Sequence, residues 1–200
     1  MNPLYVAEPR QPRLFHCCPI EVKGSPMKLI SSVLLIALTA LPAFGQQSTR
    51  EDFKEFCQAF AGRWLGDVTW IMDWPGFGKR GDKVTAFLEN RITEDGNVVV
   101  GRFFGGPGSG SSVFAYDAGA KQIRGNGADS GGTVWTAVFS KQNGKWVSAE
   151  TGSHADGTKY EGKYTVAISD GGNTHTWTGS TKITGKKADE LKDVWRRVSK

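Results

Sequence analysis

The chain has 200 residues, with 25 Lys and Arg against 20 Asp and Glu, which gives a formal net charge of +5 at pH 7. Hydrophobic residues make up 38% of the chain and aromatic residues 11%, a composition that indicates a folded globular protein and excludes an intrinsically disordered one. The excess of positive charge is too small for a dedicated nucleic-acid-binding protein, so no nucleic-acid partner is expected.

The first 45 residues have the composition of a targeting segment. Met27 and Lys28 open a basic start, residues 29–41 (LISSVLLIALTAL) are apolar, and the small residues Ala43 and Gly45 suit a cleavage site. Residues 27–45 are therefore predicted to be a secretory signal peptide, because the apolar run is too short to cross a bilayer. Residues 1–26 are interpreted as an upstream extension from a wrongly assigned start codon, with an uncleaved anchor as the alternative.

Residues 46–200 are expected to form one exported domain, located in the periplasm or outside the cell and not spanning a membrane. This segment retains 21 basic and 18 acidic residues, a formal net charge of +3. It also retains Cys57 alone, since Cys17 and Cys18 lie in the leader, so no internal disulfide is expected. The stability of the domain must then come from core packing, and the Cys57 thiol is interpreted as part of that core.

An amphipathic helix is predicted over residues 48–61. Phe53, Phe56, Cys57 and Phe60 follow one another at the spacing of a single helical face. Ser48 with Glu51, or Thr49 with Asp52, has the three-residue spacing of a helix-capping box.

From residue 62 onward the hydrophobic period changes from that of a helix to that of a strand. Dipeptides typical of tight turns recur between runs of aromatic and β-branched residues. Ten strands are predicted, at about 63–72, 83–93, 97–104, 112–117, 121–126, 133–141, 145–153, 159–168, 173–183 and 190–198. The fold class that follows is all-β, an antiparallel up-and-down β-barrel of about ten strands with one N-terminal amphipathic helix.

The connections between these strands differ at the two ends of the predicted barrel. Tight turns at 94–97, 117–121, 142–145 and 169–173 fall at one end, which the helix would close. Longer loops fall at the other end, among them the glycine-rich segments 105–111 and 125–132. Small barrels admit ligands at such an open end.

The turn residues also predict which side chains face inward. A two-residue turn at Asp95-Gly96 would place Glu89 opposite Arg102. A similar turn at Asp156-Gly157 would place Glu150 opposite Lys163.

Carried along the chain, the same alternation places His175 and Trp177 inside the barrel. It places three aromatic residues on the outer surface, where they would form a patch for a homodimer or another protein partner: Trp135, Phe139 and Trp146.

Two segments carry a family resemblance. Residues 62–66 (GRWLG) follow the helix and residues 193–198 (DVWRRV) close the chain, and together they resemble the calycin group of lipocalins and fatty-acid-binding proteins. The span from about 48 to 200 is similar to lipocalin-like exported bacterial proteins of the DUF1579 type, whose functions are largely unknown. The resemblance implies that Trp64 lies at the closed end with Arg196 or Arg197 stacked on it.

The same resemblance indicates which ligands are disfavoured. Fatty-acid-binding proteins end with an inward Arg two residues before a Tyr, and the matching positions here are Asp193 and Trp195. An inward acid would repel a carboxylate ligand, so fatty-acid transport is not the expected function.

The expected function is binding of a small hydrophobic molecule in the barrel cavity. The predicted site comprises inward aromatic residues, the inward histidine and a loop that would gate the entrance: Trp70, Phe103, Tyr160, Tyr164, Trp177, His175, Trp74 and Phe77.

Several alternatives remain open. A structural or interaction role would use the outer aromatic residues. An enzyme would use Asp193, Glu161 or His175 as acid or base, although no paired catalytic constellation is evident. No cofactor is predicted, except that some calycin-fold proteins resembling nitrobindins bind haem through a late-strand histidine, which would be His175.

Other motif matches carry less weight. Residues 76–81 fit G-x-G-x-x-G, but a strand follows where a phosphate-binding motif needs a helix. The predicted domain has two histidines and no carboxylate cluster at metal-ligand spacing, so no metal site is expected. His154 is interpreted as a solvated residue at a hairpin tip.

Overall fold

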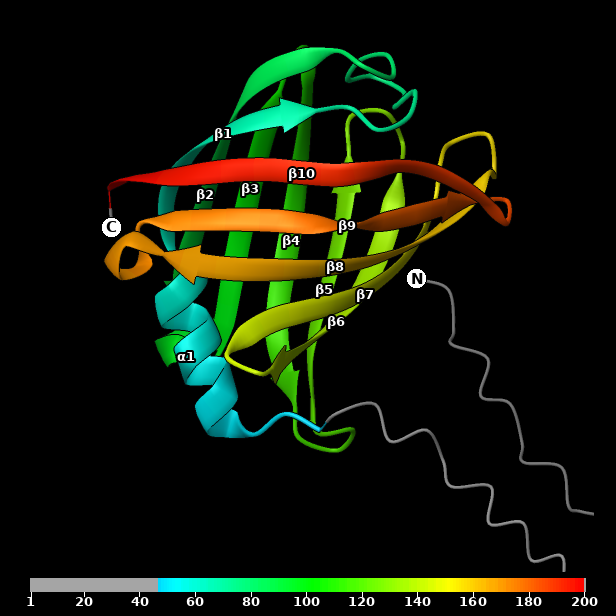
Figure 1. Cartoon of the computed structure of the whole chain (residues 1–200). Helices are drawn as coiled ribbons and strands as arrows, with labels where there is room; N and C mark the ends of the chain where they lie inside the picture. Colours follow the sequence, from blue (N-terminus) through cyan, green and yellow to red (C-terminus); the bar gives the residue numbers. More distant parts are fainter. Residues whose placement is uncertain (1–46, 200) are drawn as a thin grey trace, which may run out of the picture. The chain divides into compact units, whose positions relative to one another are not determined.

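A computed structural model of the chain describes residues 47–199. The predicted signal peptide and upstream extension lie outside this range. Within it the chain forms one α-helix, two single-turn 3-10 helices and ten strands (Figure 1). They are α1 (Arg50–Phe60), β1 (Gly62–Thr69), β2 (Lys83–Thr93), η1 (Glu94–Gly96), β3 (Val98–Gly105), β4 (Gly108–Asp117), β5 (Gln122–Asp129), β6 (Val134–Gln142), β7 (Lys145–Ser153), β8 (Lys159–Ser169), η2 (Asp170–Gly172), β9 (Thr174–Ile183) and β10 (Lys186–Ser199).

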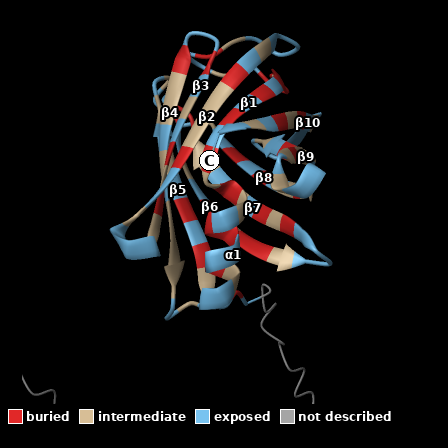
Figure 2. Ribbon diagram, turned by 90° about the vertical axis from the view of Figure 1, so that its left-hand side faces the viewer, coloured by how far each residue is buried: buried red, intermediate tan, exposed pale blue. Residues whose placement is uncertain are grey.

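The strands form a closed barrel in which each strand pairs antiparallel with its neighbours in the chain, and β1 pairs with β10. The predicted fold class is therefore confirmed. Buried and exposed residues alternate along many of the strands, as a barrel with one inner and one outer face requires (Figure 2). No helix among residues 47–199 has the length and hydrophobicity needed to cross a membrane.

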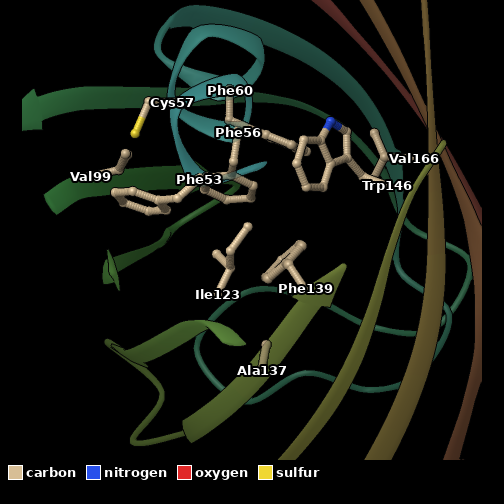
Figure 3. Close-up of a cluster of buried hydrophobic side chains, with 10 residues drawn as sticks. All are labelled: Phe53, Phe56, Cys57, Phe60, Val99, Ile123, Ala137, Phe139, Trp146 and Val166. Atoms are coloured by element: carbon tan, nitrogen blue, oxygen red, sulfur yellow. The ribbon is translucent and has the colours of Figure 1, made fainter. Parts of the chain in front are cut away.

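Helix α1 fills one end of the barrel. Thr49 and Asp52 form the capping box that starts it, each side chain accepting the other residue's backbone N–H. Its apolar face carries Phe53, Phe56 and Phe60, which are buried against Ile123, Phe139 and other residues of the barrel wall (Figure 3). The helix therefore contributes the core that the strands at this end would otherwise lack.

Trp64 anchors the closed end, as the resemblance implied. Its indole Nε1 donates a hydrogen bond to the carbonyl of Phe60 at 3.1 Å, which ties β1 to the end of α1. The guanidinium of Arg197 lies 4.0 Å from the centroid of the indole ring, and the ring of His175 lies 3.9 Å away. Arg197, and not Arg196, is thus the cation stacked on this tryptophan.

Arg197 also joins three separate chain segments. Its guanidinium donates to the carbonyl of Ala59 at 2.9 Å, to that of Ala61, and to that of Gly172 in the β8–β9 turn at 3.2 Å. Arg196 instead lies on the outer face, where it pairs with Asp67 at 2.7 Å. The planar guanidinium of Arg197 therefore donates to these three carbonyls while it stacks on Trp64, an arrangement that the ammonium of a lysine, which has no flat face, could not reproduce.

One predicted register is confirmed and one is wrong. Glu89 lies opposite Arg102, as the Asp95-Gly96 turn predicted. In the β7–β8 hairpin, however, Ser153 pairs with Lys159, so the loop between them has five residues instead of an even number. An odd loop shifts every partner by one, and Glu150 lies opposite Gly162 instead of Lys163.

Because of this shift, the residues of β6 and β7 that were predicted to face outward face the interior. Phe139 and Trp146 are 5% and 3% exposed and belong to the core, and Trp135 is half-buried against it. The predicted outer aromatic patch is therefore wrong, because these three rings point into the barrel, and the homodimer or protein partner expected from that patch loses its basis.

The glycine-rich segments are strands and not long loops. Residues 108–111 belong to β4 and residues 125–129 to β5, and only Gly106 and Pro107 connect β3 to β4. Several of these glycines lie against aromatic rings. A Cβ at Gly127 would come within 2.4 Å of the Trp135 ring, so glycine is required there by the close approach of the ring.

Replacing Arg197 with lysine tests the closed end. Arg197→Lys keeps the charge but loses the fork of hydrogen bonds and the flat stack on Trp64, so the unfolding free energy should fall by about 1–3 kcal/mol. Arg196→Lys is the matched control, because that side chain is exposed, and it should change stability by less than about 0.5 kcal/mol. Urea denaturation of both variants measures the difference, and equal effects would contradict the assigned role.

Candidate ligand-binding cavity

The barrel encloses a cavity of about 290 Å³ that extends from the helix to the mouth. This volume lies just below the range of typical small-molecule pockets, roughly 300–1,000 Å³, so it suits a small ligand. Six of the eight predicted site residues line it: Trp70, Trp74, Phe77, Phe103, Tyr164 and Trp177.

Other aromatic residues of the cavity wall were not among the predicted site residues. Trp135 and Phe139 line the cavity because of the register shift, and Phe56 and Phe60 reach it from the helix. Trp195 lines it too, at the position noted as a departure from fatty-acid-binding proteins. Nothing in the sequence indicates that the β7–β8 loop has an odd number of residues. The spacing of the helical phenylalanines, in contrast, does indicate a buried face.

The loop between β1 and β2 forms one side of the mouth. Its Trp74 donates an indole hydrogen bond to Asp129 Oδ2 at 2.9 Å, and the ring lies edge-on to Tyr160 and His154. Phe77 from the same loop is 4% exposed and packs on Gly108. The loop that was predicted to act as a gate is therefore held at the mouth by hydrogen bonds from Trp74 to Asp129 and from Arg80 to Asp189, and by the ring contacts of Trp74.

His154 is buried at the mouth, so the prediction of a solvated turn residue is wrong. Its Nδ1 lies 3.0 Å from Thr133 Oγ1, and its ring stacks on Tyr160 at 5.4 Å. The five-residue hairpin loop folds back over the barrel and carries the imidazole inward. Tyr160 itself does not line the cavity but supports the wall behind it.

Glu150 on β7 places a carboxylate on the cavity wall. The hydroxyl of Tyr160 donates a hydrogen bond to its Oε1 at 2.8 Å. Removal from water raises the pKa of Glu150 to about 7, although the tyrosine hydrogen bond acts in the opposite direction. Glu150 was expected opposite Lys163 and was not among the predicted site residues.

Asp193 on β10 is a second carboxylate on the wall, and it is 7% exposed. The backbone N–H of Thr69 donates to its Oδ1 at 3.3 Å. Burial raises the pKa of Asp193 to about 6, and the hydrogen bond from Thr69 offsets part of the effect. The inward acid that the sequence predicted at this position is present.

Tyr164 lies between the two acids. Its hydroxyl is 2.8 Å from Thr181 Oγ1, and its ring covers Gly162, where a Cβ would come within 2.3 Å of the hydroxyl. Burial, with the charge of Glu150 as a further cause, raises the pKa of Tyr164 to about 12. The phenol therefore stays neutral and can serve as a hydrogen-bond donor or acceptor to a ligand.

Two other candidate acid or base groups lie away from the cavity. Glu161 is exposed and pairs with Lys182 at 3.3 Å, so it takes no part in an interior site. His175 is 2% exposed at the closed end, and burial lowers its pKa to about 4. It is a neutral core histidine under the conditions in which most proteins work.

The residues around His175 do not fit a haem. Its Nε2 is buried and has no hydrogen-bond partner in the described part of the chain, and the rings of Phe60 and Trp64 pack against the imidazole at 5.0 and 3.9 Å between centroids. An iron ligand needs open space in front of that nitrogen, and His175 does not line the cavity. We therefore assign no haem to this histidine.

Comparison with known proteins adds no assignment. No protein-family model matches the chain. No curated protein matches it either. Among residues 47–199, no group of three or more His, Cys, Asp or Glu side chains could hold a metal ion.

The buried acids predict how stability depends on pH. The pKa of Asp193 is raised from 3.8 to about 6 and that of Glu150 from 4.5 to about 7, so the folded state retains protons that the unfolded state releases. The unfolding free energy should therefore fall as pH rises from about 4 to 8. Asp193→Asn should flatten this decline in a series of melting temperatures.

Asp67→Asn is the matched control for that series, because Asp67 is exposed on the neighbouring strand. It should keep the slope of the unmodified protein. A decline that persists unchanged in Asp193→Asn would show that the aspartate is not the group responsible.

Proposed function

We propose that the domain binds a small hydrophobic molecule inside the barrel. The observation that carries this proposal is the cavity of about 290 Å³ walled by tryptophan, phenylalanine and tyrosine rings. Preformed concave sites of this composition suit small ligands because they remove apolar surface from water without reorganising the protein. The Trp74–Phe77 loop would act as the gate.

The proposal includes a location and a family. The basic start, apolar run and small residues of segment 27–45 support export to the periplasm or the extracellular space. The barrel with its helical end and its Trp64–Arg197 stack supports membership of the calycin group, in the DUF1579 type. Cell fractionation of the full chain, with determination of the mature N-terminus, tests the export step.

Catalysis is a second candidate, favoured by one observation. Asp193 is a buried acid with a raised pKa on the cavity wall, which is a setting in which carboxylic acids transfer protons. It would appear as chemical conversion of compounds incubated with the protein, lost in Asp193→Asn. Retained conversion in that variant would remove this candidate.

The neutral dye N-phenyl-1-naphthylamine tests ligand binding directly. We expect saturable binding to the protein, measured as a rise in dye fluorescence. Gly110→Leu should weaken it at least about tenfold, because Gly110 lines the cavity and a Cβ there meets no atom closer than 3.4 Å, leaving room for a side chain that fills the space.

Val113→Leu is the matched control on the same strand. Val113 is 47% exposed on the outer face, so the added volume lies in solvent and dye binding should not change. Absence of saturable dye binding, or equal binding to Gly110→Leu, would contradict the proposal.

A further inference from the structure

We infer that the cavity selects hydrophobic molecules that carry a positively charged amine. This inference rests on the proposed binding function and specifies the chemistry of its ligand. Three features of the lining carry it: the sign of its charges, the faces of its aromatic rings, and an excess of hydrogen-bond acceptors.

The charged residues that line the cavity are all acidic. Asp129, Glu150 and Asp193 contribute carboxylates, and the described residues place no Lys, Arg or His side chain on the lining. A ligand carboxylate would add negative charge to this interior, whereas an ammonium group would neutralise it. The electrostatics of the wall therefore favour a cation over a fatty acid.

The three carboxylates differ in how many hydrogen bonds they accept from the protein. Asp129 accepts hydrogen bonds from the Trp74 indole and from the backbone N–H groups of Gly131 and Thr133, each at 2.9 Å, so it holds the mouth together. Glu150 and Asp193 each accept one hydrogen bond from the described part of the chain. These two have the capacity to bind a ligand donor.

Aromatic rings lie next to Asp193. Trp177 is directly opposite it on β9, and Trp195 is two residues further along β10, on the same inner face. The faces of indole rings attract cations, most strongly where water is excluded. A carboxylate beside such rings is suited to an ammonium group joined to an apolar body.

A further acceptor lies on the lining. The side chain of Asn90 is 5% exposed, and its Nδ2 donates to the carbonyl of Phe60 at 3.0 Å, but its Oδ1 has no partner among the residues that the structure describes. Buried acceptors of this kind normally have a donor. An ammonium group offers three donors and no acceptor, which complements the wall.

One buried donor on the lining, the indole Nε1 of Trp70, also lacks a partner within residues 47–199. A Cβ on Gly78 would lie 2.8 Å from it, so this nitrogen points under the β1–β2 loop at the mouth. Because this donor points away from the cavity, the groups that face the cavity still include more hydrogen-bond acceptors than donors.

The inference also predicts how binding depends on pH. Glu150 faces Tyr160 and Tyr164 of β8, Asp193 faces Tyr164 and the Thr69 backbone, and both phenols stay neutral because burial raises their pKa. The pKa of Glu150 is about 7 and that of Asp193 about 6, so the two acids ionise between about pH 5 and 8. An alkylamine remains protonated over that range, so its affinity should rise with pH.

Three ligands that share one ring system test the inference by isothermal titration calorimetry: 2-(1-naphthyl)ethylamine, 2-(1-naphthyl)ethanol and 1-naphthylacetate. At pH 7.5 we expect the amine to bind about tenfold more tightly than the alcohol, and the carboxylate to bind most weakly. The amine affinity should increase from pH 5 to 8, while that of the neutral alcohol should not.

Glu150→Gln and Asp193→Asn should each reduce the preference for the amine over the alcohol by threefold or more, and Asp67→Asn, which removes one exposed charge, should leave it unchanged. Equal or tighter binding of the carboxylate, or no binding of the amine, would overturn the inference. Such a result with N-phenyl-1-naphthylamine still bound would leave the proposed function intact, and the wild-type comparison requires no variant to fold.

Discussion

The guanidinium of Arg197 is the contact on which the rest of the barrel depends. It stacks on Trp64 of the first strand, reaches two carbonyls at the end of α1 and a third in the β8–β9 turn, and itself belongs to the last strand. The two strands that complete the barrel and the helix that fills it are therefore held at one place. With that end occupied by side chains of residues 47–199, the β1–β2 loop at the other end borders the mouth of the cavity.

The sequence was sufficient for the elements and the topology, because helical and strand periods are local properties that the residues display directly. It was insufficient to predict which side chains of β6 and β7 face the interior. Asp156-Gly157 has the composition of a two-residue turn, yet the backbone N–H of His154 donates to the carbonyl of Thr158 and Ser153 pairs with Lys159, so an odd number of residues separates the two strands. One residue of loop length reverses the faces of β6 and β7, so Trp135 and Glu150 could not be assigned to the cavity. The residue types at a turn indicate where the turn lies, but they do not determine how many residues it contains.

The glycines within the strands make room for aromatic rings. Because glycine is common in loops, residues 105–111 and 125–132 were predicted to be loops. Tyr160 lies over Gly152 and Tyr164 over Gly162, and at each site a Cβ would come within 2.5 Å of the ring. Large flat side chains thus lie along the wall and not across the interior, which leaves space at the centre. The same arrangement keeps the acids beside ring faces and away from bulk water, and it links the shape of the cavity to its charge.

Pairing of the first strand with the last has a further consequence for how the chain reaches its native state. Asp67 and Arg196 are 129 residues apart in sequence and meet across the β1–β10 seam. Contacts of such long range are formed at the cost of loop entropy before they return any stabilisation, so folding should be slow compared with that of helical domains of this size. Until the seam closes, β1 and β10 remain open edges able to pair with another chain. The rate at which this seam closes should therefore influence how much of the chain reaches the native barrel before its edges pair elsewhere.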